Sequence, residues 1–226
     1  MKRLLRRLCP TSPLDYFPAV PRSSLLTTAF ALLLAAPLSA QQSGPVLPIP
    51  TTSFGGQQVA VMPITMVVVD PTVESDTVFN GLRDHRTTLT WADSIIGEAL
   101  TNRAPEVKWV MPPRLRKLAR RAPGLVDDPD QMGQAMLRSS RLKDLPDQLQ
   151  TSMRNLMSLV NGRIVFVPAA IGYTRDANGQ VQAQLSLVAA DVRSGRILWR
   201  SVPTGAGPTP GAALGAALAS VLPLDQ

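Results

Sequence analysis

The sequence predicts a mixed α/β fold, an α+β sandwich in which helices cover one mixed sheet. Three observations predict it. The near-continuous apolar run at 59–69 has the composition of a strand that is buried on both faces. Helical periodicity recurs in the segments that follow this run. The stretch 162–204 then has the pattern of a C-terminal three-strand antiparallel meander, with strands at 164–174, 181–192 and 196–202.

The first forty residues have the pattern of a secretory signal peptide. Residues 25–36 are apolar or small except for two threonines, Arg22 precedes them, and Leu38-Ser39-Ala40 provides a small-residue cleavage site. This apolar segment is shorter than the about 20 residues of a membrane-spanning helix, and Pro37 ends it. We therefore expect a signal peptide at 1–40, cleavage after Ala40, a periplasmic or secreted protein, and no transmembrane helix in the mature chain.

Export changes what the charge means. The full chain has 23 basic and 16 acidic residues, a net charge of +7. Residues 1–40 hold five of the basic residues and one acid, so the mature chain keeps 18 and 15, a net charge of +3. This small excess gives no indication of nucleic-acid binding. Cys9 is the only cysteine and leaves with the signal peptide, so we expect no disulfide and no thiol chemistry.

The amino-terminal end of the mature chain is expected to be a flexible leader at 41–57, followed by a single domain at 58–222. The leader is rich in Pro, Gly, Ser, Thr and Gln. In the apolar run that follows, Pro63 has no N–H and predicts a bulge or an end of regular pairing. Residues 71–88 are polar and irregular and are expected to form a loop.

Helical patterns with strong boundary signals follow this loop. Thr90-Trp91-Ala92-Asp93 has the form of a helix start, and apolar residues recur at helical spacing up to Leu100. Residues 107–111 are a short strand candidate, and Pro112-Pro113 opens a second helix that runs to Ala122.

Two more helices are expected before the meander. Acidic side chains favour the positive end of a helix, and three aspartates precede a short helix that ends near Arg138: Asp127, Asp128 and Asp130. They do not follow the EF-hand pattern for Ca²⁺. Pro146 opens the next helix, which is expected to stop at Asn161-Gly162.

The meander pattern predicts a register. A two-residue loop at Asn178-Gly179 would place Tyr173 opposite Gln184 and Val167 opposite Ala190. Because polar residues alternate only near this loop, the sheet is expected to be covered on both faces at its base and on one face at the hairpin tip. Residues 204–210 are expected to be a loop and 212–222 a final alanine-rich helix.

The second predicted helix carries the densest charge in the mature chain. Its cations are Arg114, Arg116, Lys117, Arg120 and Arg121. Two interpretations remain open for this cluster. It is the solvated face of an amphipathic helix, or it binds an acidic envelope protein or an anionic envelope surface, such as lipid headgroups or cell-wall polymer. Nucleic acid ranks lowest, because aromatic residues are scarce and the chain is exported.

The sequence contains no recognisable catalytic, metal-binding or cofactor-binding motif. His85 is the only histidine and is expected to face solvent, whereas a metal site needs several His or Cys ligands. Neither a G-x-S-x-G nucleophile motif nor a phosphate-binding glycine loop occurs. We therefore predict no cofactor and no enzymatic activity. The alternatives are a hydrolase with a site dispersed over loops and a small-ligand-binding module.

Two segments carry a family resemblance. Val59-Ala60-Val61-Met62-Pro63 resembles the opening of TolB amino-terminal-like domains, which occur in the curli secretion channel subunit and in lipoprotein activators of peptidoglycan synthases. Asp191-Val192-Arg193-Ser194-Gly195-Arg196-Ile197-Leu198-Trp199 is similar to their late hairpin. The resemblance covers about residues 57–222, and Pro168-Ala169 departs from it where such domains usually have glycine. It implies an exported bacterial envelope protein that acts by non-enzymatic binding.

Overall fold

The computed structural model describes residues 46–222, and the predicted signal peptide and its cleavage site lie outside them. The elements in chain order are α1 (Thr51–Phe54), β1 (Gln58–Val61), β2 (Val67–Val69), the 3-10 helix η1 (Thr77–Leu82), α2 (His85–Arg103), β3 (Lys108–Val110), α3 (Pro112–Ala119), the 3-10 helix η2 (Gln134–Arg138), α4 (Asp147–Ser158), β4 (Ile164–Arg175), β5 (Val181–Asp191), β6 (Ile197–Ser201), β7 (Thr204–Gly207) and α5 (Pro210–Val221). Within 46–222, no helix combines the length and the apolar character that crossing a bilayer requires.

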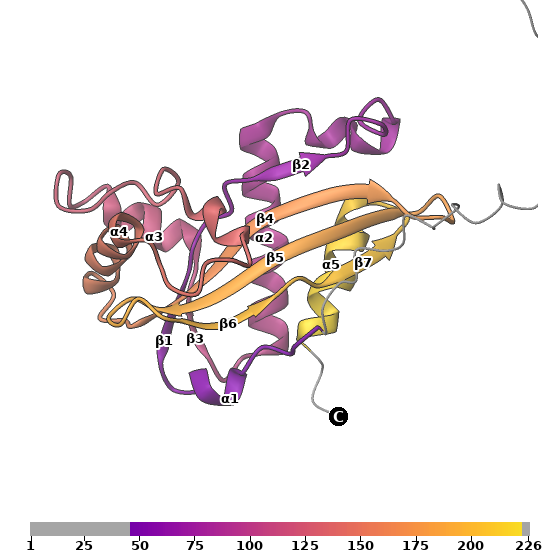
Figure 1. The fold of residues 1–226 in the computed structure, drawn as a ribbon. Coiled ribbons are helices and arrows are strands. Elements are labelled where there is room, and N and C mark those ends of the chain that lie inside the picture. The colour runs from indigo at the N-terminus through magenta and orange to yellow at the C-terminus, as the bar shows by residue number, and fades with distance from the viewer. Residues whose placement is uncertain (1–45, 223–226) are drawn as a thin grey trace, which may run out of the picture. The chain divides into compact units, whose positions relative to one another are not determined.

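The strands form one mixed sheet whose long central pair is β4 and β5 (Figure 1). Its order is β3-β1-β4-β5-β6, with β2 beside β4 and β7 beside β5. The pairs β1–β3, β1–β4 and β2–β4 are parallel. The pairs β4–β5, β5–β6 and β5–β7 are antiparallel. Helices pack on this sheet, so the predicted α+β sandwich with its antiparallel meander is confirmed.

The first apolar run is a central strand that breaks where Pro63 was expected to break it. Val59 pairs with Trp109 of β3 on one side and with Ile164 of β4 on the other. Residue pairing in β1 ends at Val61, and pairing with β4 resumes at Val67, as β2, after Ile171 has donated its N–H to Met66. Proline has no N–H to donate to a ladder, which explains why the run divides.

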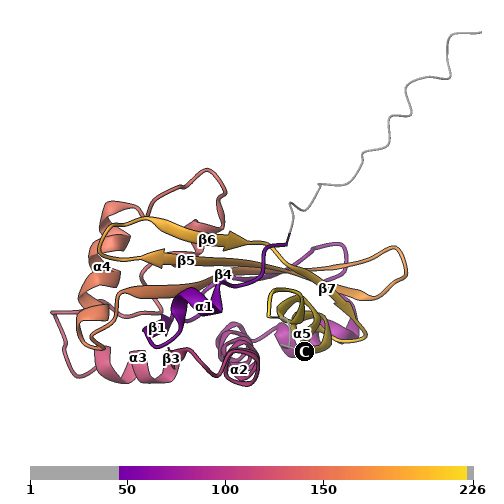
Figure 2. The ribbon, with the colours of Figure 1, turned by 90° about the horizontal axis from the view of Figure 1, so that it is seen from below.

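Two hydrophobic cores lie on opposite faces of the sheet. Helices α2 and α5 cover one face, where Ile96 and Leu214 pack with sheet residues that include Phe166. Figure 2 shows these two helices on the same side of the strands. Helices α3 and α4 contribute to the second core, in which Leu115 and Met153 are fully buried. The domain therefore has helices on both faces of its sheet.

The predicted meander register is wrong, and two local features explain the error. Tyr173 pairs with Ala183, one residue from the prediction, and Val167 pairs with Val188, two residues from it. Arg175, the last residue of β4 to pair, lies opposite Val181, so the turn has five residues (176–180) rather than two. A bulge at Ala169 then adds the second shift. The same bulge keeps the alternating apolar residues of β4 directed at their two cores.

The uncovered sheet face near the hairpin tip lies where the alternation of polar residues predicted it. Gln184 is exposed, and Gln182, Ser186 and Thr174 are partly exposed. Their neighbours in β5 on the other face, such as Leu185, are fully buried. The prediction that the tip is covered on one face only is therefore confirmed.

Four segments differ from the sequence-based expectations. Within the described part of the expected leader, residues 51–54 form α1, the N–H of Ile49 donates to the carbonyl of Val221 at 2.9 Å, and Phe54 is buried. Helix α2 begins at His85 rather than at Thr90, because the Asp84 carboxylate accepts the N–H of Thr87 and caps it. The expected loop at 71–88 contains η1, and the expected loop at 204–210 contains β7.

Candidate functional site

A polar cleft of about 860 Å³ opens beyond the carboxyl end of β1. Strands β1 and β3 are adjacent and parallel, but the helices that follow them, α2 and α3, pack on opposite faces of the sheet. Neighbouring parallel strands whose connections leave to opposite sides create a crevice at their carboxyl ends, where α/β proteins bind ligands. The cleft lies at this switch point, and Thr65, which follows β1, forms part of its lining.

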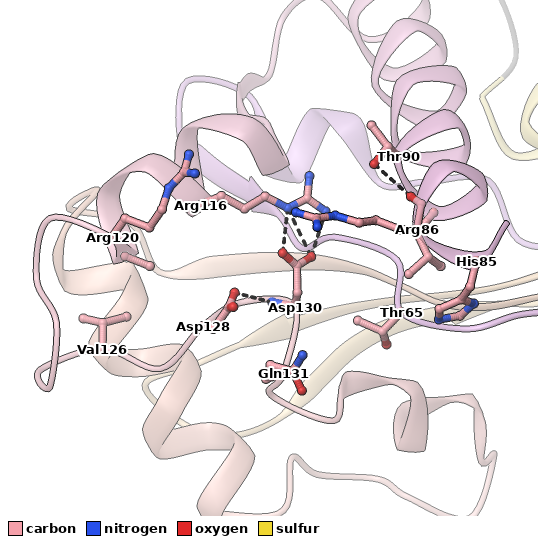
Figure 3. Close-up of a pocket in the computed structure, with 12 residues that line it drawn as sticks. Thr65, His85, Arg86, Thr90, Arg116, Arg120, Val126, Asp128, Asp130 and Gln131 are labelled. Atoms are coloured by element: carbon pink, nitrogen blue, oxygen red, sulfur yellow. Dashed lines mark hydrogen bonds and ion pairs between the residues drawn. The ribbon is translucent and has the colours of Figure 1, made fainter.

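Side chains from two helices and one loop complete the lining. Helix α2 contributes His85 and Arg86 from its first turn, and α3 contributes Arg116 and Arg120. The loop between α3 and η2 contributes acids, of which Asp130 is the closest to Arg116. Figure 3 shows Arg86 and Arg116 extending toward one another from the two helices. The cleft lining therefore contains more arginines than acids.

Arg116 holds the walls of the cleft together. Its Nη2 donates to Asp93 Oδ2 of α2 at 2.7 Å and to Asp130 Oδ1 at 2.8 Å. Its Nε donates to both oxygens of Asp130, at 2.8 and 3.1 Å (Figure 3). This fork-like contact is the geometry that a planar guanidinium offers to a carboxylate. These bonds raise the pKa of Arg116 above its ordinary value, and the bond to Asp130 is the largest cause. The side chain therefore stays charged.

Asp93 extends this network to the end of β1. Its Oδ1 accepts the backbone N–H of Ile64 at 2.8 Å, and its side chain is only 6% exposed. Burial raises the pKa of the Asp93 carboxyl, an effect larger than the opposing ones of its hydrogen bonds to Ile64 and Arg116. The predicted helix start at Thr90-Trp91-Ala92-Asp93 is wrong, because Asp93 lies in the third turn of α2, where it is buried.

The five predicted site cations divide into two groups. Arg116 is partly buried in the network, and Arg120 is exposed at the edge of the cleft. The others are exposed outside the cleft lining: Arg114, Lys117 and Arg121. The structure gives four ion pairs within 46–222, and none of them involves these three residues or Arg120. We call Arg114, Lys117, Arg120 and Arg121 the α3 basic face.

The aspartates after α3 do not cap η2 as the sequence suggested. The residue before η2 is Gly133, which has a left-handed φ of 75° and offers no side chain. Asp130 instead pairs with Arg116, and Asp128 Oδ1 accepts the N–H of Asp130 at 3.1 Å. Asp127 accepts a hydrogen bond from Ser152 of α4. These acids fix the loop that forms one wall of the cleft.

Sequence reasoning missed the cleft and the contribution of Arg86. Arg86 was expected to lie with His85 in a solvent-facing loop; both are exposed, but they belong to the first turn of α2 and line the cleft. One signal was available. Asp93 stands three residues before Ile96 on the apolar side of the helix, and a carboxylate there needs a buried partner. Among the residues described, no group of three His, Cys, Asp or Glu could hold a metal ion.

Comparison with known proteins yields weak structural similarities. No protein-family model matches the sequence, and no curated protein matches it significantly. The PelC dodecamer from Paraburkholderia phytofirmans is 17% identical, with 82% of this chain and 96% of that chain covered and a TM-score of 0.36. The LpoB C-terminal domain from Salmonella enterica is 16% identical, with 68% and 83% covered and a TM-score of 0.36.

A third similar structure is lipoprotein GNA1162 from Neisseria meningitidis. It is 15% identical, with 67% of this chain and 81% of that chain covered, and its TM-score is 0.31. At TM-scores this low the three similarities carry no argument about function. The resemblance of the sequence to TolB amino-terminal-like domains stays a prediction.

Proposed function

We propose that this chain is an exported envelope protein that binds an acidic envelope component, without catalysis, through the α3 basic face. The observation that carries the proposal is the division of the α3 cations. Arg116 is neutralised inside the fold, whereas Arg114, Lys117, Arg120 and Arg121 are exposed and make no ion pair within 46–222. Export rests on the apolar segment and cleavage pattern of residues 1–40.

The strength of such a surface follows from the number of its cations. Near an anionic surface each basic residue adds about 1 kcal/mol of attraction, screened over about 8 Å at physiological salt. The four cations lie within eight residues of the chain, so they act together on one stretch of an anionic surface, which scattered charges do not. Lys117 lies in the last turn of α3 and Arg120 is its C-cap residue, so these two cations suit the negative end of the helix dipole.

The chemistry of the cleft supports binding rather than proton transfer. Arg116, the residue at its centre, is held in its charged form by two carboxylates. Asp93, whose carboxyl pKa is raised, is covered by the backbone of Ile64 and by Arg116 and is absent from the cleft lining. Groups held in this way position other side chains, and they do not exchange protons with a substrate.

Co-sedimentation with isolated envelope membranes, at several salt concentrations, tests the proposal. The variant carries Arg114→Gln, Lys117→Gln and Arg121→Gln, which removes charge but leaves the fold-bearing Arg116 in place. We expect wild-type binding that weakens steeply with salt, and loss of most binding in the variant. A matched variant, Arg138→Gln with Arg141→Gln and Lys143→Gln, removes three exposed cations elsewhere and should bind like wild type.

Two outcomes would contradict the proposal. One is envelope binding that is unchanged in the α3 variant or that does not depend on salt. The other is a protein found with Met1 intact in the cytosolic fraction by amino-terminal sequencing, since an unprocessed cytosolic chain would not meet the envelope component.

A further inference from the structure

Two guanidinium groups at the cleft have no partner among residues 46–222. Arg86 and Arg120 line the cleft from α2 and α3, and neither side chain makes an ion pair or a hydrogen bond to any residue in 46–222. Between them, Arg116 uses its Nε and Nη2 on Asp93 and Asp130. The cleft therefore presents the guanidinium groups of Arg86 and Arg120, unpaired in the described part of the chain, beside Arg116, whose guanidinium already binds carboxylates.

The acids of the cleft select among anions. Asp128 and Asp130 also line it, and their charges oppose a doubly charged phosphate more strongly than a singly charged carboxylate. Asp128 Oδ1 accepts the N–H of Asp130, while its Oδ2 accepts no hydrogen bond from residues 46–222 and remains available to a donor. A ligand that carries both a carboxylate and N–H donors satisfies both sides of the cleft.

The volume and the framework of the cleft suit a compact ligand segment. Its volume of about 860 Å³ lies within the range of about 300–1,000 Å³ in which proteins bind compact ligands. The ion pairs of Arg116 and the bond from Ile64 to Asp93 fix its walls before any ligand arrives. Thr65 adds a buried hydroxyl that finds no partner in the described part of the chain.

We propose that this cleft is a carboxylate-recognition site that binds an acidic peptide segment of a partner protein. The guanidinium groups of Arg86 and Arg120 receive a glutamate or aspartate carboxylate, and Asp128 accepts an N–H of the bound segment. The inference rests on the proposed function, because it assigns the partner of that binding protein to a chemical class. The site of the inference differs from that of the proposed function, because the α3 basic face apart from Arg120 lies outside the cleft lining.

Isothermal titration calorimetry tests the inference with protein purified after expression of the full chain. The probes are an acetylated, amidated tetrapeptide of glutamate, the same peptide made of glutamine, and inorganic phosphate. We expect the glutamate peptide alone to bind. Because each variant removes charge-assisted hydrogen bonds, we expect Arg86→Gln and Arg120→Gln each to weaken binding of this peptide about tenfold. The matched variant Arg114→Gln with Lys117→Gln, outside the cleft lining, should change affinity by less than about twofold.

Each other outcome overturns the inference in a distinguishable way. Equal binding of phosphate, with the same sensitivity to Arg86→Gln, would contradict the choice of carboxylate. Equal loss in the matched variant would show attraction to the whole basic face, and the proposed function would stand without the cleft. Absence of peptide binding, with salt-dependent envelope binding intact, would overturn the inference alone. Envelope binding that does not depend on the α3 cations would contradict the proposed function itself.

Discussion

Asp93 of α2 and Arg116 of α3 form an ion pair of 2.7 Å between two helices that pack on opposite faces of the sheet. The pair closes around the end of β1, because Asp93 also accepts the N–H of Ile64. One bond network therefore joins both helical layers and the central strand, and it does so at the base of the cleft. Its integrity sets the geometry of the candidate site.

Arg116→Ala is expected to destabilise the domain strongly. Removing one partner of a buried ion pair leaves the other charge without compensation and costs about 3–5 kcal/mol. Because Arg116 is 22% exposed, we expect a loss near the lower end, about 3 kcal/mol. Urea unfolding measures it. Lys117→Ala, the exposed neighbour, is the control and should change the free energy of unfolding by less than about 0.5 kcal/mol. Equal effects in both variants would show that the network does not stabilise the fold.

Trp199→Ala should leave little folded protein at 37 °C. Trp199 is 8% exposed and stacks on Phe166, with ring centroids 6.2 Å apart. Truncation of a buried aromatic side chain costs about 3–5 kcal/mol, a large part of the about 5–15 kcal/mol that stabilises a domain. Trp199→Phe is the informative control, because it keeps a ring and removes an indole N–H that has no partner within 46–222. A melting temperature of Trp199→Ala close to wild type would contradict this packing.

Gly205→Ala should separate β7 from α5. A Cβ at Gly205 would overlap backbone atoms of Ala213 and Ala217, which cannot move without shifting the helix. Overpacking of this kind costs about 1–3 kcal/mol or more. Gly172→Ala is the control, because a Cβ at Gly172 meets no atom within 4 Å. Thermal unfolding should distinguish the two variants; an unaffected Gly205→Ala would show that β7 is not held against α5.

Asp191 should make stability depend on pH in acid. Hydrogen bonds from Arg163 are the main cause that lowers the pKa of Asp191 from 3.8 to about 2. A carboxyl with a lowered folded-state pKa contributes stability that is present above pH 3.8 and is lost as the pH falls through about 2. The shift corresponds to about 1–2 kcal/mol, since the exposed half of Arg163 weakens the pair.

Asp191→Asn tests this contribution, because asparagine keeps the acceptor for the N–H of Arg193 and loses the charge. The difference in the free energy of unfolding between wild type and variant should be about 1–2 kcal/mol at pH 7 and should shrink toward zero near pH 2. A difference that stays constant with pH would show that the Arg163 pair contributes nothing.

The local parts of this fold could be predicted from the sequence, and the long-range parts could not. Pro63 breaks a strand for reasons contained in its own ring, and the helix starts at Pro112 and Pro146 follow equally local rules. The bulge at Ala169 depends on the partner strand, and it displaced the predicted register. The pairing of Asp93 with Arg116 joins residues 23 positions apart, which no periodicity reveals.

The same limit explains what was missed at the candidate site. The sequence shows five cations on one helix, but only the position of Asp93 in the fold separates Arg116 from the other four. Arg86 enters the cleft because Asp84 starts α2 earlier than the pattern at Thr90 suggested. Both errors arise from contacts between segments rather than from the properties of either segment.

Site-specific photocrosslinking in living cells tests the central claim, that the surface around α3 contacts an envelope partner. A photoreactive side chain replaces Lys117 on α3 in one strain and Asn102, an exposed residue at the far end of α2, in another. We predict that the Lys117 position crosslinks to one envelope component, that Arg114→Gln with Arg121→Gln abolishes the product, and that the Asn102 position yields none. Crosslinking of the same component from both positions, or from Asn102 alone, would contradict the account.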